Sequence, residues 1–237
     1  MFIFLDTETT GTGPEDRLCQ IAFKTEGGKP VDELFNPSMP ISIEAMVIHH
    51  ITNEMVADKP KFKGSDTHKK LQLIFADPEA VLVAHNAKFD VSMLNREDLH
   101  PMRSICTYKL ARYLDREGMI PQYNLQYLRY YLKLNINATP HTALGDILVL
   151  EALFNRIYVK FKEGATGDPA DDMIRISGSP VLVPRMPFGK HKGLKMGVVP
   201  LDYLEWLSGT NLDEDLAYTV HHYLAKTGQG SEYDVGI

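Results

Sequence analysis

Two acidic residues stand at the end of an apolar, β-rich segment at the N-terminus. Between residues 2 and 8, the side chains of Phe4, Asp6 and Glu8 occupy every second position. Side chains alternate between the two faces of a strand, so these three are expected to point the same way, with both carboxylates aimed at one spot. The alternative is that the strand ends at Leu5 and that the two acids belong to a solvated turn.

A third acid, Asp146, lies near the start of the longest helix that the sequence predicts, over residues 142–161. Helical spacing places it on one stripe with Leu150, Leu153 and Ile157. An ionised carboxylate on an apolar stripe is costly unless it is paired or bound to a metal ion. The other interpretation is a first-turn acid that the helix dipole favours.

The segment from His85 to Asp90 combines a strand end, an expected helix N-cap at Asn86 and an acid in the first turn of the next helix. Asp90 lies partly on the inward side of that helix, although a surface acid near a helix N-terminus is the simpler alternative. His141 precedes the acid of the longest helix by five residues and can converge on it only from the loop before the helix. Pro140 supports that placement, because the residue before a proline avoids helical geometry.

Four acids and one histidine from separate segments together predict a metal-dependent catalytic site. Oxygen ligands without sulfur suit Mg²⁺ or Mn²⁺, and two such ions side by side clamp a phosphoryl group for in-line displacement. An imidazole can take a proton from the attacking water, because its pKa is close to neutral. The candidate catalytic residues are Asp6, Glu8, Asp90, Asp146 and His141, with the four acids as metal ligands.

The elements that must position these residues alternate between strand-like and helix-like in the first half of the chain. This pattern indicates an α/β or mixed sheet covered by helices. We expect a main domain over residues 1–161, a Gly- and Pro-containing linker over 162–186 and a small C-terminal module over 187–226. Residues 227–237 are polar and Gly-rich and are expected to be disordered.

The composition is that of an ordinary globular protein. Hydrophobic residues make up 44% and charged residues 24%, which argues against a disordered chain. The two cysteines form no disulfide framework, and no apolar run reaches the ~18 residues of a membrane span. We therefore expect a cytoplasmic protein without a membrane partner.

Three motifs, in this order, resemble the DEDD superfamily of 3′-to-5′ exonucleases, in the branch whose fifth residue is histidine. They are Asp-Thr-Glu-Thr-Thr-Gly at 6–11, His-Asn-Ala-Lys-Phe-Asp at 85–90 and His-Thr-Ala-Leu-Gly-Asp at 141–146. Residues 187–193 and 203–207 are similar to a C-terminal module found in some relatives. The resemblance thus covers most of the chain outside the expected linker.

The resemblance implies a ribonuclease-H-like fold, a mixed five-stranded sheet flanked by helices, with the small C-terminal module added to it. It also implies two Mg²⁺ ions, for which Mn²⁺ can substitute, and release of 5′-mononucleotides from DNA with a free 3′ end, in repair or end trimming. The DNA can be single-stranded or duplex. The residues expected to contact nucleic acid are Thr9, Thr10, Gly11, His49, His85, Asn86 and Phe89.

The net charge of −6 means that nucleic acid must be held by bound cations or by a local basic patch. Between Met173 and Pro200 the sequence has five basic residues and no Asp or Glu. In this stretch Lys190, Lys192 and Lys195 are the predicted contacts to DNA. The alternative is a solubilising basic loop.

Other functions stay open at this stage. They are RNA 3′-end trimming, a proofreading subunit of a polymerase and a nucleic-acid-binding module without catalysis. The oligomeric state is also open, a homodimer included. Small residues at Thr12 and Gly13, where relatives often carry larger side chains, predict weaker activity on blunt duplexes.

Four tyrosines cluster in one predicted helix and the segment just before it. Tyr123, Tyr127, Tyr130 and Tyr131 could stack nucleic-acid bases. A half-buried amphipathic stripe is the favoured interpretation, because aromatic residues at helical spacing usually pack against a core.

Overall fold

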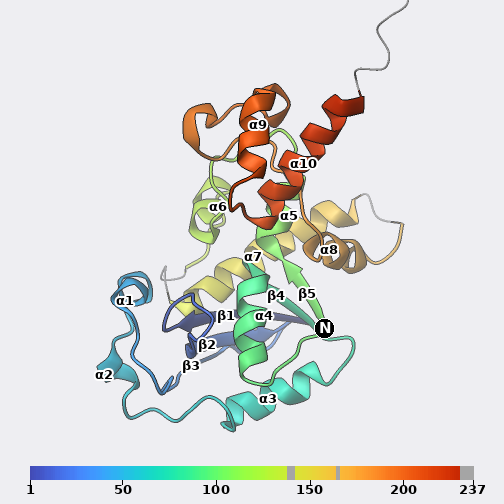
Figure 1. Ribbon diagram of the computed structural model, residues 1–237. Coiled ribbons are helices and arrows are strands. Elements are labelled where there is room, and N and C mark those ends of the chain that lie inside the picture. The colour runs from blue at the N-terminus through green and yellow to red at the C-terminus, as the bar shows by residue number, and fades with distance from the viewer. Residues whose placement is uncertain (138–141, 164–165, 230–237) are drawn as a thin grey trace, which may run out of the picture.

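A computed structural model describes residues 1–137, 142–163 and 166–229, and Figure 1 shows their arrangement. At its centre lies a five-stranded sheet in the order β3-β2-β1-β4-β5. The central strand β1 runs antiparallel to β2 and parallel to β4, so the mixed sheet expected from the resemblance is confirmed. The strands are β1 (Phe2–Thr9), β2 (Leu18–Thr25), β3 (Val31–Leu34), β4 (Val81–Ala84) and β5 (Arg103–Cys106).

Helices cover both faces of this sheet, and a second group of helices follows it in the chain. Several of them begin at a hydroxyl or amide residue that caps the helix: the side chains of Ser42, Ser65, Asn124 and Thr142 each accept a backbone N–H. The helices are α1 (Ile43–His49), α2 (Asn53–Val56), α3 (Asp66–Phe75), α4 (Ala87–Arg96), α5 (Thr107–Leu114), α6 (Leu125–Tyr131), α7 (Ala143–Lys162), α8 (Pro169–Ser177), α9 (Leu201–Ser208) and α10 (Glu214–Gln229), with short 3₁₀ turns at Gly189–His191 and Met196–Val198.

Alternation along the strands sends side chains into two separate hydrophobic clusters. Phe4 and Val83 pack on one face with residues of α5, α6, α7 and α8. Leu5 and Leu82, the neighbouring residues in each strand, pack on the other face with residues of α3 and α4. Asp6 therefore continues the face of β1 that α7 covers.

The helix α7 has the apolar stripe that its sequence predicts. Leu150, Leu153 and Ile157 are buried in the cluster that also contains Phe4, and the rings of Phe4 and Phe154 lie 5.3 Å apart. This packing fixes α7 along β1. It brings the N-terminal turn of α7, with Asp146, to the end of β1 that carries Asp6 and Glu8.

The expected linker over residues 162–186 is wrong in its central part. Residues 169–177 form α8, which Asp168 caps and Pro169 opens, and both are ordinary signals for a helix start. Met173 and Ile176 are buried in the cluster beneath α5 and α7. This segment is therefore part of the main hydrophobic core, because its apolar side chains find partners on helices distant in sequence.

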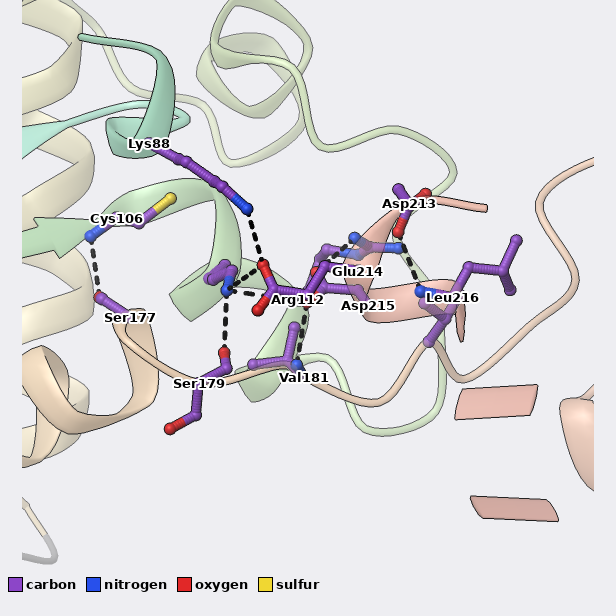
Figure 2. Close-up of polar contacts among 12 residues, drawn as sticks. Lys88, Cys106, Arg112, Ser177, Ser179, Val181, Asp213, Glu214, Asp215 and Leu216 are labelled. Carbon is purple, nitrogen blue, oxygen red and sulfur yellow. Dashed lines mark hydrogen bonds and ion pairs between the residues drawn. The ribbon is translucent and has the colours of Figure 1, made fainter. Parts of the chain in front are cut away.

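The C-terminal helices have their own small core, which contains Val183, Leu204, Leu207 and Leu216. Figure 2 shows how polar contacts join it to the sheet-containing part. The carboxylate of Asp215 pairs with Arg112 of α5 at 2.8 Å and accepts the Val181 N–H at 3.0 Å. Both charged side chains are buried, so this pair is a fixed attachment.

The division into a main domain over 1–161 and a module over 187–226 stays a prediction, whereas the expected tail begins too early. Residues 227–229 belong to α10, and residues 230–237 lie outside the described part of the chain. The two cysteines are both free and buried. None of the helices in the described residues is both long and apolar enough to cross a bilayer.

Candidate active site

Three carboxylates from β1 and α7 converge at one point of the structure. Ligand oxygens of Asp6, Glu8 and Asp146 all lie within 4.8 Å of one another. The N-terminal turn of α7 reaches them because Ala143 and Ile147 pack against Ala22 of β2, the residue paired with Asp6. The strand reading of residues 2–8 is confirmed, since β1 continues to Thr9 and the acids are not in a solvated turn.

The fourth acid, Asp90, lies beside this group rather than within it. It is buried in the first turn of α4. Its Oδ1 accepts both the backbone N–H of Thr7, at 3.1 Å, and the Thr7 hydroxyl, at 2.8 Å. Asp90 is therefore tied to the strand residue between Asp6 and Glu8, and the alternative of a surface acid is wrong.

The four carboxyl groups share a site that disfavours their charge. Burial raises the pKa of Asp6 well above its usual value, and the neighbouring Asp90, Glu8 and Asp146 raise it further. Burial and then the charges of Asp146 and Asp90 raise the pKa of Glu8 to about 8. The pKa of Asp90 rises to about 7 through burial, although its hydrogen bonds with Thr7 oppose the shift.

Asp6 and Glu8 gain no help from nearby lysine or arginine in the described part of the chain, since every charge acting on them raises the pKa. A divalent cation would supply the missing positive charge and restore the ionised carboxylates. The donor set is entirely oxygen, which fits a hard divalent metal ion. The site can therefore hold such an ion.

A glutamine that the sequence reading missed completes the site. The side-chain amide of Gln126, on α6, donates to Oδ1 of Asp146, and its carbonyl oxygen accepts from the buried Arg129 at 3.3 Å. This chain of contacts fixes the direction of the Asp146 carboxylate. No spacing in the sequence connects residues 126 and 146, so only the packing of α6 on α7 could reveal the contact.

The Asp16 carboxylate makes two hydrogen bonds within the loop after β1. Asp16 accepts the Thr10 hydroxyl at 2.6 Å and the Gly13 N–H at 2.7 Å. A Cβ on Gly11 would come within 2.6 Å of an Asp16 oxygen, which explains the glycine at that position. Thr9, the last residue of β1, and Thr10 are buried, so Gly11 is the most accessible of the three contacts predicted here.

His49 is predicted to contact nucleic acid, but the structure ties it into the protein. It is buried, its Nε2 donates to the Thr9 carbonyl at 3.1 Å, and its Nδ1 accepts the Ile51 N–H at 3.0 Å. The ring is neutral because its Nδ1 accepts a hydrogen bond, and burial lowers its pKa. Its clearest role is to anchor α1 against the end of β1.

His85, like His49, is held within the protein by hydrogen bonds, here to residues of two other segments. Its Nε2 donates to the Tyr123 carbonyl at 2.8 Å, and its Nδ1 bonds the Thr107 hydroxyl at 2.9 Å. Burial lowers its pKa to about 4, so the ring is neutral. Both nitrogens are thus engaged, which leaves only ring carbons for the predicted contact with nucleic acid.

The neighbouring Asn86 stands at the N-cap position of α4 without capping it. Its backbone is left-handed, with φ of 68°, and its side chain makes no cap hydrogen bond within the described residues. Asn86 thus stands at the predicted position, but the prediction that its side chain caps the helix is wrong. Its exposed amide and the partly buried Phe89 keep their predicted contacts to nucleic acid open.

One predicted site residue, His141, falls outside the described residues. Lys190, Lys192 and Lys195 all belong to the C-terminal part. Lys195 pairs with Glu117 at 2.6 Å, and the Lys190 ammonium lies 5.1 Å from the centre of the Tyr203 ring.

Comparison with known proteins places the chain among exonucleases. An exonuclease family model (RNase_T) matches residues 3–154. Exodeoxyribonuclease 10 of Escherichia coli K12 is 36% identical over 96% of this chain and 100% of that protein. DNA polymerase III subunit epsilon of Treponema pallidum is 33% identical over 65% of this chain and 74% of that protein.

Solved structures show the same relationship. Exonuclease X in complex with 5′ overhanging duplex DNA matches with a TM-score of 0.59 and 35% identity, over 75% of this chain and 100% of that one. Escherichia coli exonuclease I with a dT13 oligonucleotide has a TM-score of 0.54 and 22% identity, over 67% of this chain and 40% of that one, and shares the fold. The resemblance seen in the three motifs is therefore confirmed, and the chain belongs to the exonuclease family.

Proposed function

We propose that this chain hydrolyses phosphodiesters at DNA 3′ ends and releases 5′-mononucleotides, in DNA repair or end trimming. The observation that carries the proposal is the convergence of Asp6, Glu8 and Asp146 within 4.8 Å, from elements far apart in the sequence. A relative that matches along its full length is named an exodeoxyribonuclease, and a structural relative was solved with duplex DNA. Both favour DNA over RNA as the substrate.

We propose two Mg²⁺ ions as the natural cofactors, with Mn²⁺ as a substitute. Asp6, Glu8 and Asp146 would hold one ion, and Asp6 and Asp90 would share the second with the substrate phosphate. Bound there, such ions neutralise the charge that develops on the phosphate oxygens and acidify the attacking water. Both hydrogen bonds from Thr7 go to Oδ1 of Asp90, so among the described residues they leave its Oδ2 for this role.

His141 is the proposed acceptor of the proton from the attacking water, on the strength of the third motif. The rate should then fall as the pH drops through the histidine pKa. His141→Ala should slow turnover and leave Mn²⁺ binding, measured by calorimetry, close to that of the wild type. An equal loss of metal binding would show that His141 has a different role.

The experiment that tests the function is a time course on a 5′-labelled DNA oligomer with Mg²⁺, Mn²⁺ or chelator. We expect a descending ladder of products from the 3′ end, formed only with metal. Asp146→Asn should abolish it. Asp66→Asn is the matched control, since Asp66 is also a first-turn acid but is fully exposed. Faster digestion of a matched RNA oligomer would favour the RNA-trimming alternative.

We further propose that the C-terminal part contributes DNA contacts through Lys190 and Lys192. Lys192 is exposed and has no ion pair among the described residues, whereas Lys195 already pairs with Glu117. Replacing Lys190 and Lys192 with Ala should weaken DNA binding and reduce its salt dependence. An unchanged salt slope would favour the solubilising-loop alternative.

We also propose a cytoplasmic location. Both cysteines are free and buried, which suits a reducing compartment. Cell fractionation should recover the protein with cytoplasmic markers, and recovery with the membrane fraction would contradict this.

A further inference from the structure

The helix α6 presents tyrosine rings to solvent. Tyr130 is 67% exposed and Tyr131 is 46% exposed, so the predicted half-buried stripe is wrong for Tyr130. It holds for Tyr123, which is partly buried and donates its hydroxyl to Asp115 at 2.8 Å. Large exposed aromatic rings that cluster on a surface commonly mark a binding site.

The rings form an ordered surface. Tyr127 and Tyr131 are one helical turn apart, and their rings stack at 5.9 Å with an angle of 22°. The guanidinium of the buried Arg129 lies 5.3 Å from the centre of the Tyr130 ring. Arg129 is itself fixed, because it donates to the Ile136 carbonyl at 2.6 Å.

This surface continues into the candidate active site. An open groove of about 380 Å³ is lined by Tyr127, Tyr130 and Tyr131 together with Gln122, Asn124 and Gln126. Gln126 contacts Asp146 directly. Asn124 also lines the separate cavity that contains His85 and Asn86. The groove therefore reaches the site through the contact of Gln126 with Asp146. Through Asn124 it also borders the cavity lined by His85 and Asn86 of the second motif.

The charge along this stretch suits a polyanion. Between Glu117 and Asp146 the sequence has no Asp or Glu, and it contains Arg129 and Lys133. Glu117 itself pairs with Lys195, so α6 follows a loop that contacts the basic stretch of the C-terminal part. In Figure 1, α6 lies between that part and the N-terminal end of α7.

We propose that Tyr127, Tyr130 and Tyr131 form a base-stacking subsite for the single strand that leads to the 3′ end. Every base has a π-face, so such a subsite binds single strands without regard to sequence. The subsite rests on the proposed function, because its ligand is the substrate of the adjoining site. It holds nucleotides upstream of the scissile bond and lowers the KM for long single strands.

The test compares two substrates with the variants Tyr130→Ala and Tyr131→Ala. Oligo-dT fills the groove, whereas the p-nitrophenyl ester of thymidine 5′-monophosphate is too short to reach beyond the site. Each variant should raise the KM for oligo-dT by about tenfold and leave kcat and the ester hydrolysis unchanged. Tyr218→Ala, a tyrosine of α10 that is 45% exposed, is the control and should change neither substrate.

Two further variants separate stacking from apolar contact and from folding. Tyr130→Trp should keep the wild-type KM, and Tyr130→Leu should raise it, because only the former retains a flat ring. An unchanged KM in both Ala variants, or full rescue by Leu, would overturn the subsite. Oligo-dT affinity in Ca²⁺, measured by fluorescence anisotropy, tests the subsite independently of hydrolysis: a wild type that binds but never cleaves would refute the proposed function alone.

Discussion

Replacing Glu8 with Gln is expected to stabilise the metal-free protein at alkaline pH. Burial and the charges of Asp146 and Asp90 raise the pKa of Glu8 from 4.5 to about 8. A carboxyl whose pKa is raised by folding stabilises the folded state below its unfolded pKa, and this contribution is lost as the pH rises through the folded pKa. The free energy of unfolding of the metal-free wild type should therefore fall between about pH 4.5 and pH 8 as Glu8 ionises. The E8Q variant should lack the decrease that comes from Glu8.

The size of the effect follows from the shift. Each pKa unit corresponds to about 1.4 kcal/mol, so full ionisation of Glu8 would cost on the order of 5 kcal/mol. Glu8 is partly exposed, and solvent screening lowers the expected difference to about 2 kcal/mol. For a chain of this length, that corresponds to about 5 °C in Tm.

Differential scanning calorimetry in chelator at pH 5 and pH 9 measures this difference. E8Q should exceed the wild type by about 5 °C at pH 9 and match it at pH 5. Adding Mg²⁺ at pH 9 should raise the Tm of the wild type and leave E8Q unchanged. Glu205→Gln, an exposed glutamate of α9, is the control. An E8Q protein less stable than wild type at pH 9 would refute the argument from carboxylate repulsion.

Three other perturbations have defined outcomes. Gln126→Ala should raise the Mg²⁺ concentration for half-maximal rate by about tenfold, because residues that orient a metal ligand typically have effects of this size. Gln72→Ala, at an exposed glutamine, is the control and should not change it. A lower kcat with an unchanged Mg²⁺ dependence would contradict this. Asp215→Ala leaves the buried Arg112 charge unpaired and should lower the free energy of unfolding, measured by urea titration, by about 3 kcal/mol. A loss below about 0.5 kcal/mol would mean that the pair is exposed to solvent. Blunt duplex DNA should be digested more slowly than single strands, since Thr12 and its glycine neighbour offer no bulky wedge; equal rates would disprove that reading.

Features set by local sequence could be predicted well. The stripe of Leu150, Leu153 and Ile157 on α7 follows from helical spacing alone, and all three side chains are buried. Asp6 and Glu8 share a face because a strand has a period of two residues. The convergence of α7 on β1 did not follow from spacing, and the motif resemblance supplied it.

Features that depend on tertiary packing could not be predicted. The Gly- and Pro-containing composition around α8 suggests a linker, but Met173 and Ile176 have partners on helices distant in the sequence. Gln126 reaches Asp146 only because α6 packs on α7. His85 looks like a site residue in its motif, yet its hydrogen bonds to Thr107 and Tyr123 show a structural position.

The central claim is that carboxylates from β1 and α7 jointly bind the divalent cations that cleave terminal phosphodiesters. Anomalous scattering from crystals soaked in Mn²⁺ tests it most directly. We expect a strong peak among the oxygens of Asp6, Glu8 and Asp146, and no peak there in Asp146→Asn crystals. A wild-type map with no peak at these oxygens, in crystals whose protein still cleaves DNA with Mn²⁺, would contradict the claim.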